Sequence, residues 1–449
     1  MRDRTQHRCS ACGGSFARWS GRCPQCASWG TLVLEHAGRR RAVGLAAQAV
    51  PIEAIPCGAG EPYATGLGEL DRALGGGLVP GSVSLLSGEP GIGKSTLLLQ
   101  GAAALAAQGR RCLIVSAEES AEQVRRRAAR LGAVVAGLHL LETTSLAAAL
   151  EVAEELRPDL LVVDSIQTVA DPAAAAGAGS VAQVRECAAR LAAHAKASGT
   201  ATILVGHVTK DGALAGPRAL EHLVDTVLRF EGDRHHALRV LHVLKHRFGP
   251  AGEVGVFELT GAGLEGVADP SAHLLADRLP SVPGSVVVPV LEGHRPLLVE
   301  LQALVTPSQL ALPRRVAGGL PGGRLALVLA VLEQRAGVAL SGADVFTSVV
   351  GGLRVAEPAV DLALALALAS AAAGAVLGGD LVAFGEVGLG GELRQVTHVQ
   401  RRLAEAARRG FCRAVVPAST PAPCGAIELV RAATLAEAIA AAGCAPAPG

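Results

Sequence analysis

The chain has 449 residues, half of them apolar, so it can form two or three domains with large cores. Its formal net charge of +1 excludes a protein that is basic throughout, and any surface for nucleic acid must be local. The N-terminus lacks a basic stretch followed by an apolar one, which argues against a secretory signal peptide and for a cytoplasmic protein.

Two Cys-x-x-Cys pairs lie near the N-terminus, at Cys9, Cys12, Cys23 and Cys26. Two such pairs can supply four thiolates to one tetrahedral zinc ion. Two disulfides or a redox dithiol are the alternatives, but the other six cysteines are scattered singly, which favours a reducing compartment. We therefore predict a structural zinc module, and its closed coordination shell excludes a catalytic metal.

Three aromatic residues, Phe16, Trp19 and Trp29, fall within this module. The simpler interpretation is that they complete a core too small to be stable without metal. The alternative is a surface for base stacking or partner docking beside Arg18 and Arg22.

A complete phosphate-binding loop follows an apolar run at 83–87 and precedes a predicted helix at 97–108. In this motif backbone N–H groups and the helix N-terminus bind phosphate, the lysine contacts the β- and γ-phosphates, and the next hydroxyl binds Mg²⁺. Lys94 and Ser95 take these last two roles. The predicted ATP-binding residues are Gly88, Glu89, Pro90, Gly91, Ile92, Gly93, Lys94, Ser95 and Thr96.

A parallel α/β sheet is predicted from four apolar runs, at 83–86, 112–115, 160–163 and 202–205. Ligands of such sheets bind at the carboxyl ends of the strands. Glu118 and Glu119 follow the second run, and either could activate water against the γ-phosphate. Asp164 follows the third run as a magnesium ligand, and His207 follows the fourth as a γ-phosphate sensor. Each could be an ordinary helix cap, but together with the phosphate-binding loop they favour an ATPase.

Strands are also expected at 237–244 and 255–259, on either side of Lys245-His-Arg-Phe-Gly. Side chains two apart on an extended segment point the same way, so Lys245 and Arg247 could share one anion. The chain's own phosphate site lies at Lys94, so these cations could reach the nucleotide of a neighbouring subunit. A solvated hairpin is the alternative.

The stretch 362–379 lacks charged residues and approaches the length of a membrane span. It consists mostly of Ala, Leu and Gly and directly follows Asp361, so we expect a buried helix of a soluble domain instead.

The order of these motifs resembles the bacterial RadA (Sms) family over essentially the whole chain. The motifs are the four-cysteine module, the phosphate-binding loop, Glu-Glu, Val-Val-Asp-Ser-Ile-Gln-Thr, Gly-His-Val-Thr-Lys and Lys-x-Arg-Phe-Gly. The resemblance implies a RecA-like hexameric ATPase that binds single-stranded and branched DNA, works with the RecA recombinase and drives branch migration.

By the same resemblance Asp164 is the Walker B acid, and Glu118 or Glu119 is the catalytic glutamate. Lys245 and Arg247 match the family's Lys-Asn-Arg-Phe-Gly motif, which couples ATP turnover to work on DNA. His246 replaces the family's Asn in this motif, which puts any role of the amide in doubt.

The region from about residue 271 resembles the peptidase domain of Lon. Lon uses a serine activated by a lysine, but the corresponding positions here are Ala359 and Gln400, and no lysine follows Lys245. Proteolysis by that dyad is therefore excluded, and the resemblance implies a scaffold for a hexameric ring. Four arginines could contact DNA phosphates or be merely solvated: Arg314, Arg315, Arg324 and Arg354.

The predicted fold class is α/β, with a RecA-like P-loop ATPase core between an N-terminal zinc ribbon and a C-terminal Lon-protease-like α/β domain. The predicted boundaries are 1–36 for the zinc module, 37–60 for a linker, 61–270 for the ATPase and 271–449 for the Lon-like domain. The function predicted is a DNA-dependent ATPase, and the alternative is an ATP-gated regulatory module that does not move along DNA.

Overall fold

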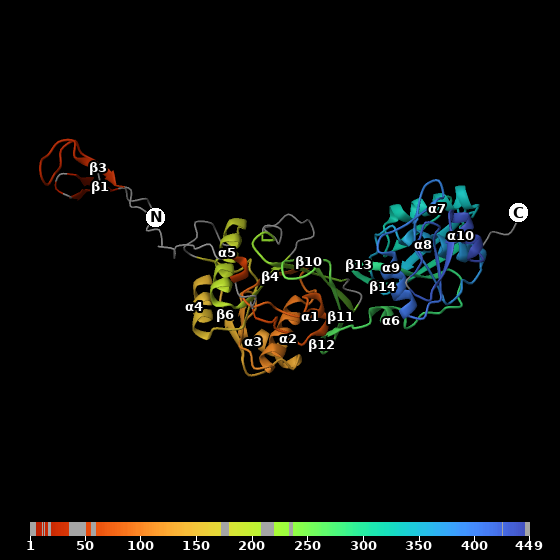
Figure 1. Ribbon diagram of the computed structural model, residues 1–449, viewed down its shortest axis with the longest axis horizontal. Helices are drawn as coiled ribbons and strands as arrows, with labels where there is room; N and C mark the ends of the chain where they lie inside the picture. The colour runs from red at the N-terminus through yellow and green to blue at the C-terminus, as the bar shows by residue number, and fades with distance from the viewer. Residues whose placement is uncertain are drawn as a thin grey trace. The chain divides into compact units, whose positions relative to one another are not determined.

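The computed structural model describes residues 6–10, 12, 14–16, 19–35, 51–54, 60–171, 179–207, 220–232, 237–423 and 425–444 (Figure 1). The contacts within the chain divide it into two units, Met1–Gly58 and Ala59–Gly449. The predicted linker residues 39–41 lie outside the described residues.

The first unit contains a small antiparallel sheet in the order β2-β1-β3. Its strands are β1 (Gln6–Cys9), β2 (Ser15–Phe16) and β3 (Leu32–Glu35), and a short 3₁₀ helix η1 lies at Ile52–Ala54. The buried core consists of Cys9, Cys23 and Leu32, with Phe16 and Cys26 packed against it. So few apolar side chains cannot hold a fold together alone, and a metal is expected to do so.

The second unit begins with a nine-stranded sheet in the order β12-β11-β10-β9-β4-β8-β7-β5-β6. Six of its strands are parallel: β4 (Val83–Gly88), β5 (Cys112–Ser116), β6 (Leu138–Glu142), β7 (Leu160–Asp164), β8 (Ala201–His207) and β9 (Thr226–Glu231). The other three are antiparallel: β10 (Leu238–His246), β11 (Val254–Thr260) and β12 (Gly263–Gly266). All four strands predicted for the parallel sheet are confirmed.

Successive side chains of the central strands point to opposite faces of this sheet, as the pleat requires. Val83 and Leu85 of β4 pack in one buried cluster, whereas Leu86 packs in another. The first cluster is covered by α4 (Leu146–Leu156) and α5 (Val181–Ser198). The second is covered chiefly by α1 (Gly68–Ala73) and α2 (Lys94–Ala107), with α3 (Ala121–Arg130) at its margin. The sheet is thus apolar on both faces, and its polar residues are confined to the strand ends.

The rest of the second unit is built on a seven-stranded sheet in the order β15-β16-β14-β13-β17-β20-β21. The strands are β13 (Ser285–Glu292), β14 (Arg295–Pro307), β15 (Arg315–Gly318), β16 (Ala343–Val349), β17 (Leu381–Ala383), β20 (Arg413–Pro417) and β21 (Glu428–Ala432). The helices are α6 (Pro270–Leu275), α7 (Gly322–Ala336), α8 (Val360–Ala373), α9 (Val399–Arg408) and α10 (Leu435–Ala441), and a ribbon is formed by β18 (Glu386–Val387) and β19 (Leu393–Arg394).

Helix α8 corresponds to the uncharged stretch in the sequence, and its residues from Val360 to Ser370 are all buried. They pack within the large apolar cluster of this region. Within the described part of the chain, no helix has both the length and the apolarity to cross a membrane. The prediction of a buried helix is confirmed.

A buried carboxylate on α1 connects the two sheets of the second unit. Glu69 accepts hydrogen bonds from Arg72 of the same helix (3.1 Å), from the Val256 N–H of β11 (2.8 Å) and from Arg295 at the start of β14 (2.5 Å). Burial alone would raise the pKa of Glu69, but the three hydrogen bonds outweigh it and lower that pKa. Arg295 also donates to the carbonyl of Ala268 (2.9 Å), in the segment between the sheets.

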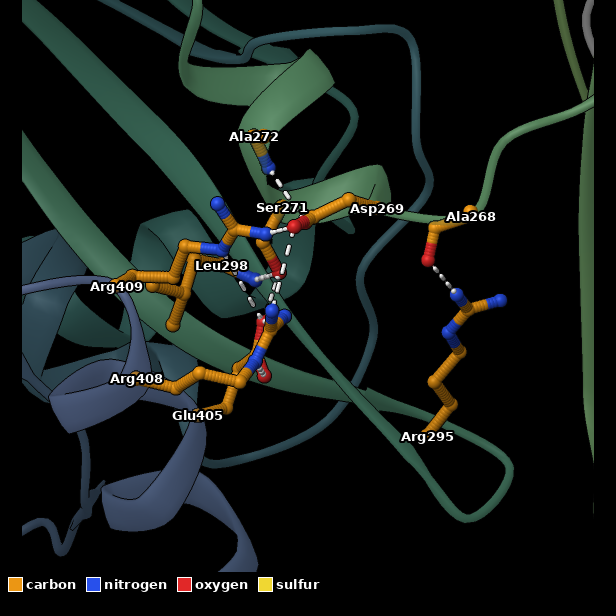
Figure 2. Close-up of polar contacts among 9 residues, drawn as sticks. All are labelled: Ala268, Asp269, Ser271, Ala272, Arg295, Leu298, Glu405, Arg408 and Arg409. Carbon is orange, nitrogen blue, oxygen red and sulfur yellow. Dashed lines mark hydrogen bonds and ion pairs between the residues drawn. The ribbon is translucent and has the colours of Figure 1, made fainter.

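Figure 2 shows the polar contacts that fix this segment where it enters α6. Asp269 caps the helix by accepting from the Ala272 N–H, and it forms ion pairs with Arg408 and Arg409. Next to it, the Ser271 hydroxyl donates to Glu405 (2.6 Å). The junction is therefore held by charged hydrogen bonds as well as by the chain itself.

Candidate nucleotide site and zinc module

The phosphate-binding loop joins β4 to α2, as the sequence predicted. Gly91 and Gly93 adopt positive φ angles of 78° and 111°, which other residues rarely adopt. A side chain on Gly88 would lie 2.5 Å from the backbone oxygen of Phe230, so only glycine fits there. Together these residues leave the loop backbone and the N-terminus of α2 open to a phosphate group.

Lys94 begins α2 and is buried beneath the loop. Its ammonium group donates to the carbonyl oxygens of Gly88 and Glu89, at 2.9 Å each. Burial lowers the pKa of Lys94, while the charges of Asp164 and Glu118 oppose that effect. A buried cation held by two neutral carbonyls is well suited to exchange them for phosphate oxygens.

The next hydroxyl, that of Ser95, donates to the carboxylate of Asp164 at 2.5 Å. Burial raises the pKa of Asp164, and the hydrogen bond from Ser95 partly offsets it. A hydroxyl and a carboxylate at this separation can both be ligands of one Mg²⁺ ion, which prefers hard oxygen donors. The donor set therefore fits the predicted magnesium site.

The two glutamates that follow β5 have different surroundings. Glu118 accepts a hydrogen bond from the Ser165 hydroxyl (2.5 Å), and the His207 Nε2 lies 3.2 Å from both of its carboxylate oxygens. Glu119 instead forms an ion pair with Arg127 of α3. Both glutamates line the same pocket as Ser95 and Asp164, but only Glu118 is held by residues at the ends of β7 and β8.

The other predicted cations lie at the opposite end of the sheet. The Lys245 ammonium donates to the carbonyls of Glu221 (2.7 Å) and Val224 (2.8 Å), and Arg247 pairs with Asp225 (2.9 Å). Asp225 in turn accepts from the N–H of Val83, at the start of β4, whereas the phosphate-binding loop follows the end of that strand. Lys245 and Arg247 thus face the same segment, 221–225, at the end of β4 away from their own phosphate-binding loop.

The four N-terminal cysteines come together as predicted. Their sulfur atoms all lie within 4.8 Å of one another, and the Cys9–Cys26 and Cys12–Cys23 sulfur pairs are each 3.7 Å apart. Four sulfurs about 2.3 Å from a tetrahedral zinc ion would be separated by nearly the same distance. The arrangement fits one Zn²⁺ and is too open for disulfide bonds.

The matches to known families agree with this geometry. Residues 66–213 match a family described as an AAA domain, and residues 7–33 match one described as a rubredoxin metal binding domain. A DNA repair protein RadA of Mycobacterium tuberculosis is 49% identical over 445 residues, which cover 97% of this chain and 92% of that protein. The RadA of Mycolicibacterium smegmatis is 48% identical (94% and 93% covered), and that of Bacillus subtilis is 43% identical (96% and 97% covered).

The chain belongs to the RadA family. Membership agrees with the observed fold, in which a zinc ribbon precedes a P-loop core built on a parallel sheet. The sequence similarity extends to nearly the full length of the relatives and so includes the C-terminal region.

The aromatic residues of the RadA zinc module do not all take the structural role that the simpler interpretation gave them. Phe16 packs against the small core, but Trp19 and Trp29 are 63% and 74% exposed. The interpretation of both tryptophans as core residues is therefore wrong. A module whose fold is stabilised by a metal ion bound to four cysteines does not need these side chains in an apolar core. The guanidinium of Arg22 lies 5.9 Å from the centre of the Trp29 ring, whereas Arg18 lies outside the described residues.

A cysteine substitution tests the zinc assignment. Cys23→Ser is expected to lower the zinc content of the purified protein, because it removes one of four thiolates and the hydroxyl is a poor replacement. Cys412→Ser is the matched control, since that thiol is exposed and lies outside the cluster. Elemental analysis measures the zinc; equal zinc in the two variants would show that the four-cysteine site is wrong.

The two positions that the resemblance aligns with the Lon dyad carry no reactive side chain. Ala359 is buried at the start of α8, and its carbonyl accepts from the Gly385 N–H (3.0 Å). Gln400 on α9 donates to the Ala422 carbonyl (2.8 Å). Near Ala359, Glu357 is bound by the fully buried guanidinium of Arg402 (2.6 Å). Among the described residues, Ala359 and Gln400 therefore make structural contacts, and neither side chain can act as a nucleophile or a base.

The arginines predicted to contact DNA differ in whether their guanidinium groups are already bound within the protein. Arg324 pairs with the buried carboxylate of Asp361 (2.6 Å), and two carbonyls of the 340–343 turn accept from Arg315. Arg314 and Arg354 are exposed. A DNA contact by Arg324 would break a buried ion pair, so Arg314 and Arg354 remain the better candidates.

Two residues of the nucleotide site were missed from the sequence. Ser165 and Arg127 decide how the two glutamates are held, but Ser165 was given no role within its motif and Arg127 lies in no motif. Ser165 directly follows Asp164, so a hydroxyl next to the Walker B acid was the available signal. Arg127 lies eight residues beyond Glu119, among other arginines, and its sequence position alone does not single it out.

Proposed function

We propose that this RadA chain hydrolyses ATP with Mg²⁺ in response to single-stranded DNA and uses the turnover to promote branch migration of recombination intermediates. The observation that carries the proposal is the position of Glu118. Its carboxylate is held by Ser165 and His207 in the pocket that also contains Ser95 and Asp164. This is the arrangement that an ATPase needs, with a base for water beside the metal and phosphate ligands.

Each residue then has a distinct chemical task. Lys94 and the loop N–H groups bind the β- and γ-phosphates, and Ser95 with Asp164 binds the Mg²⁺ that neutralises them. Glu118 orients the attacking water and accepts its proton. His207 contacts Glu118 and so can report whether a γ-phosphate is present. Glu119, paired with Arg127, supports the wall of the pocket.

The proposal includes a homo-oligomer, with the hexamer of the family as its form. Lys245 and Arg247 lie at the end of β4 opposite to their own phosphate-binding loop, which leaves them available to the nucleotide of a neighbouring subunit. A cation supplied from a neighbour can raise phosphoryl-transfer rates by about 10³–10⁵-fold in related ATPases. The C-terminal, Lon-like region would serve as the scaffold of the ring, and RecA would be the recombinase partner.

The DNA-repair role comes from the relatives, each of which is named a DNA repair protein. The DNA surfaces proposed here are local, because the net charge of the chain is only +1. They are the exposed Trp19 and Trp29 with Arg22, which could stack bases, and Arg314 with Arg354 in the C-terminal region.

A branched-DNA assay tests this function. A fluorescent three-strand intermediate is mixed with the full-length chain and ATP, and extension of the joint is followed with time. The expected result is extension with ATP and none with a non-hydrolysable analogue. If the chain binds single-stranded DNA with an affinity that falls steeply with salt but extends no joint, the result would contradict the motor and favour the ATP-gated regulatory module.

A further inference from the structure

The side chain of His246 bridges two elements of the ATPase core. Its Nδ1 lies 2.9 Å from the hydroxyl oxygen of Thr226 on β9, and its Nε2 lies 3.2 Å from the carbonyl oxygen of Leu74, which caps the C-terminus of α1. A carbonyl oxygen can only accept, so the partners assign the proton to Nε2. Nδ1 then accepts from the Thr226 hydroxyl. The neutral ring thus satisfies a terminal carbonyl of α1 that no helical N–H can reach.

The hairpin that carries His246 is shaped to leave room for the ring. A Cβ atom on Gly249 would lie 2.8 Å from the ring Cδ2, closer than van der Waals contact allows. Phe248 packs edge-on against the imidazole, with the ring centres 6.0 Å apart. Gly249 therefore affects His246 sterically, because the absence of a side chain at this position leaves room for the ring.

The two neighbours of His246 are attached to a different part of the core. Lys245 and Arg247 bind the segment 221–225, whereas His246 binds the end of α1. The strand end is consequently held from two directions, and His246 supplies the only side-chain bond to α1 among the described residues of this motif. Loss of the ring would leave the two cations tethered on one side alone.

We propose that His246 is a positioning residue, which in its neutral form fixes Lys245 and Arg247 by tying their strand to α1 and Thr226. This inference rests on the proposed function and on the role that the family resemblance implies for those two cations, the coupling of ATP turnover to work on DNA. It also explains how the chain tolerates a histidine where the family motif has asparagine. Both side chains offer one acceptor and one donor, although the amide is shorter than the ring.

The surroundings of the ring favour its neutral form. Among the described residues, the ring contacts the Leu74 carbonyl of α1, the Thr226 hydroxyl of β9, and Phe248 and Gly249 of its own hairpin. None of these four groups is titratable. Burial lowers the pKa of His246 below the ordinary 6.5, and the bond to Leu74 opposes this only partly. The folded state thus disfavours the protonated ring, so the ring stays neutral as the pH falls through 6.5 and takes up a proton only around the lower pKa of the folded state.

A double-mutant cycle tests the inference through DNA-stimulated ATP turnover. Gly249→Ala should displace the ring and lower stimulated turnover by about tenfold, the order expected when two partly buried hydrogen bonds are disturbed. In a His246→Asn background the shorter side chain leaves space for the new methyl group. There the same Gly249→Ala change should cost no more than about threefold, within the limits of additivity for residues that no longer touch.

An equal loss from Gly249→Ala in both backgrounds would overturn the inference, since the ring would then not mediate the effect. A pH series gives a second, independent readout: at pH values below the lowered pKa of His246 in the folded state, the His246→Asn variant should keep stimulation that the wild type loses. Superimposable pH profiles of the two would also overturn it.

Failure of the proposed function can be recognised separately. If DNA does not stimulate even the wild type, the coupling role is refuted. The positioning itself is then judged by ¹⁵N-histidine NMR, with the His246 signals assigned from the His246→Asn variant. A ring protonated on Nδ1 at neutral pH, or one that titrates at or above its ordinary pKa, would contradict it.

Discussion

Replacing Glu118 with glutamine is expected to stop ATP hydrolysis while ATP binding persists. The amide keeps the size of the side chain and can still accept from Ser165, but it cannot take a proton from water. Enzymes that lose a general base slow by about 10²–10⁴-fold. Phosphate release measures turnover, and a fluorescent ATP analogue measures affinity.

Glu119→Gln is the matched control, because it makes the same chemical change at the next residue. Glu119 pairs with Arg127 and is not held by Ser165 or His207, so its variant should lose only a few-fold in turnover. An order of effects opposite to this, with Glu119→Gln inactive and Glu118→Gln active, would show that the roles of the two glutamates are reversed.

Replacing Lys94 with alanine is expected to abolish nucleotide binding and DNA-stimulated turnover together. The lysine is buried, and its two carbonyl partners in the loop would be left without a donor. The chain has only three other lysines: Lys196 on α5 and Lys245 at the opposite end of the sheet are not placed to act for it, and Lys210 lies outside the described residues. Analytical ultracentrifugation should show that the variant still forms the proposed oligomer, since Lys94 is buried within the subunit.

Lys94→Arg separates charge from geometry in the same experiment. The guanidinium keeps the positive charge but is larger and planar, and it cannot occupy the space between the carbonyls of Gly88 and Glu89. We expect it to be as inactive as the alanine variant. Turnover near the wild-type rate in Lys94→Arg would mean that a nearby positive charge is enough and that the buried contacts are dispensable.

The parallel strands and their functional ends could be predicted because they depend on local patterns. A buried strand is a continuous apolar run, and its first polar residue marks the edge at which ligands bind. Asp164 and His207 were found in this way. The strands β6 and β9 were missed. Strand β6 lies at the edge of the sheet and is largely exposed, so it lacks a continuous apolar run. Strand β9 is identified by its pairing with β4, which is distant in sequence, and with β10.

The choice between Glu118 and Glu119 could not be made from the sequence. Both follow the same strand, and their difference depends on Ser165 and Arg127, which the fold brings from elsewhere. The zinc module shows the opposite case. The cysteine spacing predicted the cluster, but the number of aromatic residues suggested a core that a metal-centred fold does not need, so Trp19 and Trp29 lie on the surface.

The ring contacts of His246 were equally beyond the sequence. A departure from the family's motif was visible, but its partners Leu74 and Thr226 lie on elements far apart in the chain. Likewise, the expectation of an extended strand predicted that the side chains of Lys245 and Arg247 point to the same side of that strand. Only the structure shows that they bind the segment 221–225. Predicted boundaries of the ATPase and Lon-like regions, near residue 270, stay a prediction.

The central claim is that single-stranded DNA controls ATP turnover at this phosphate-binding loop. Its most direct test is the steady-state rate of phosphate release by the full-length chain, measured with and without an oligonucleotide at low and high salt. A rate that rises several-fold with DNA at low salt, and less at high salt, is the expected result. The same rate under all four conditions would contradict it.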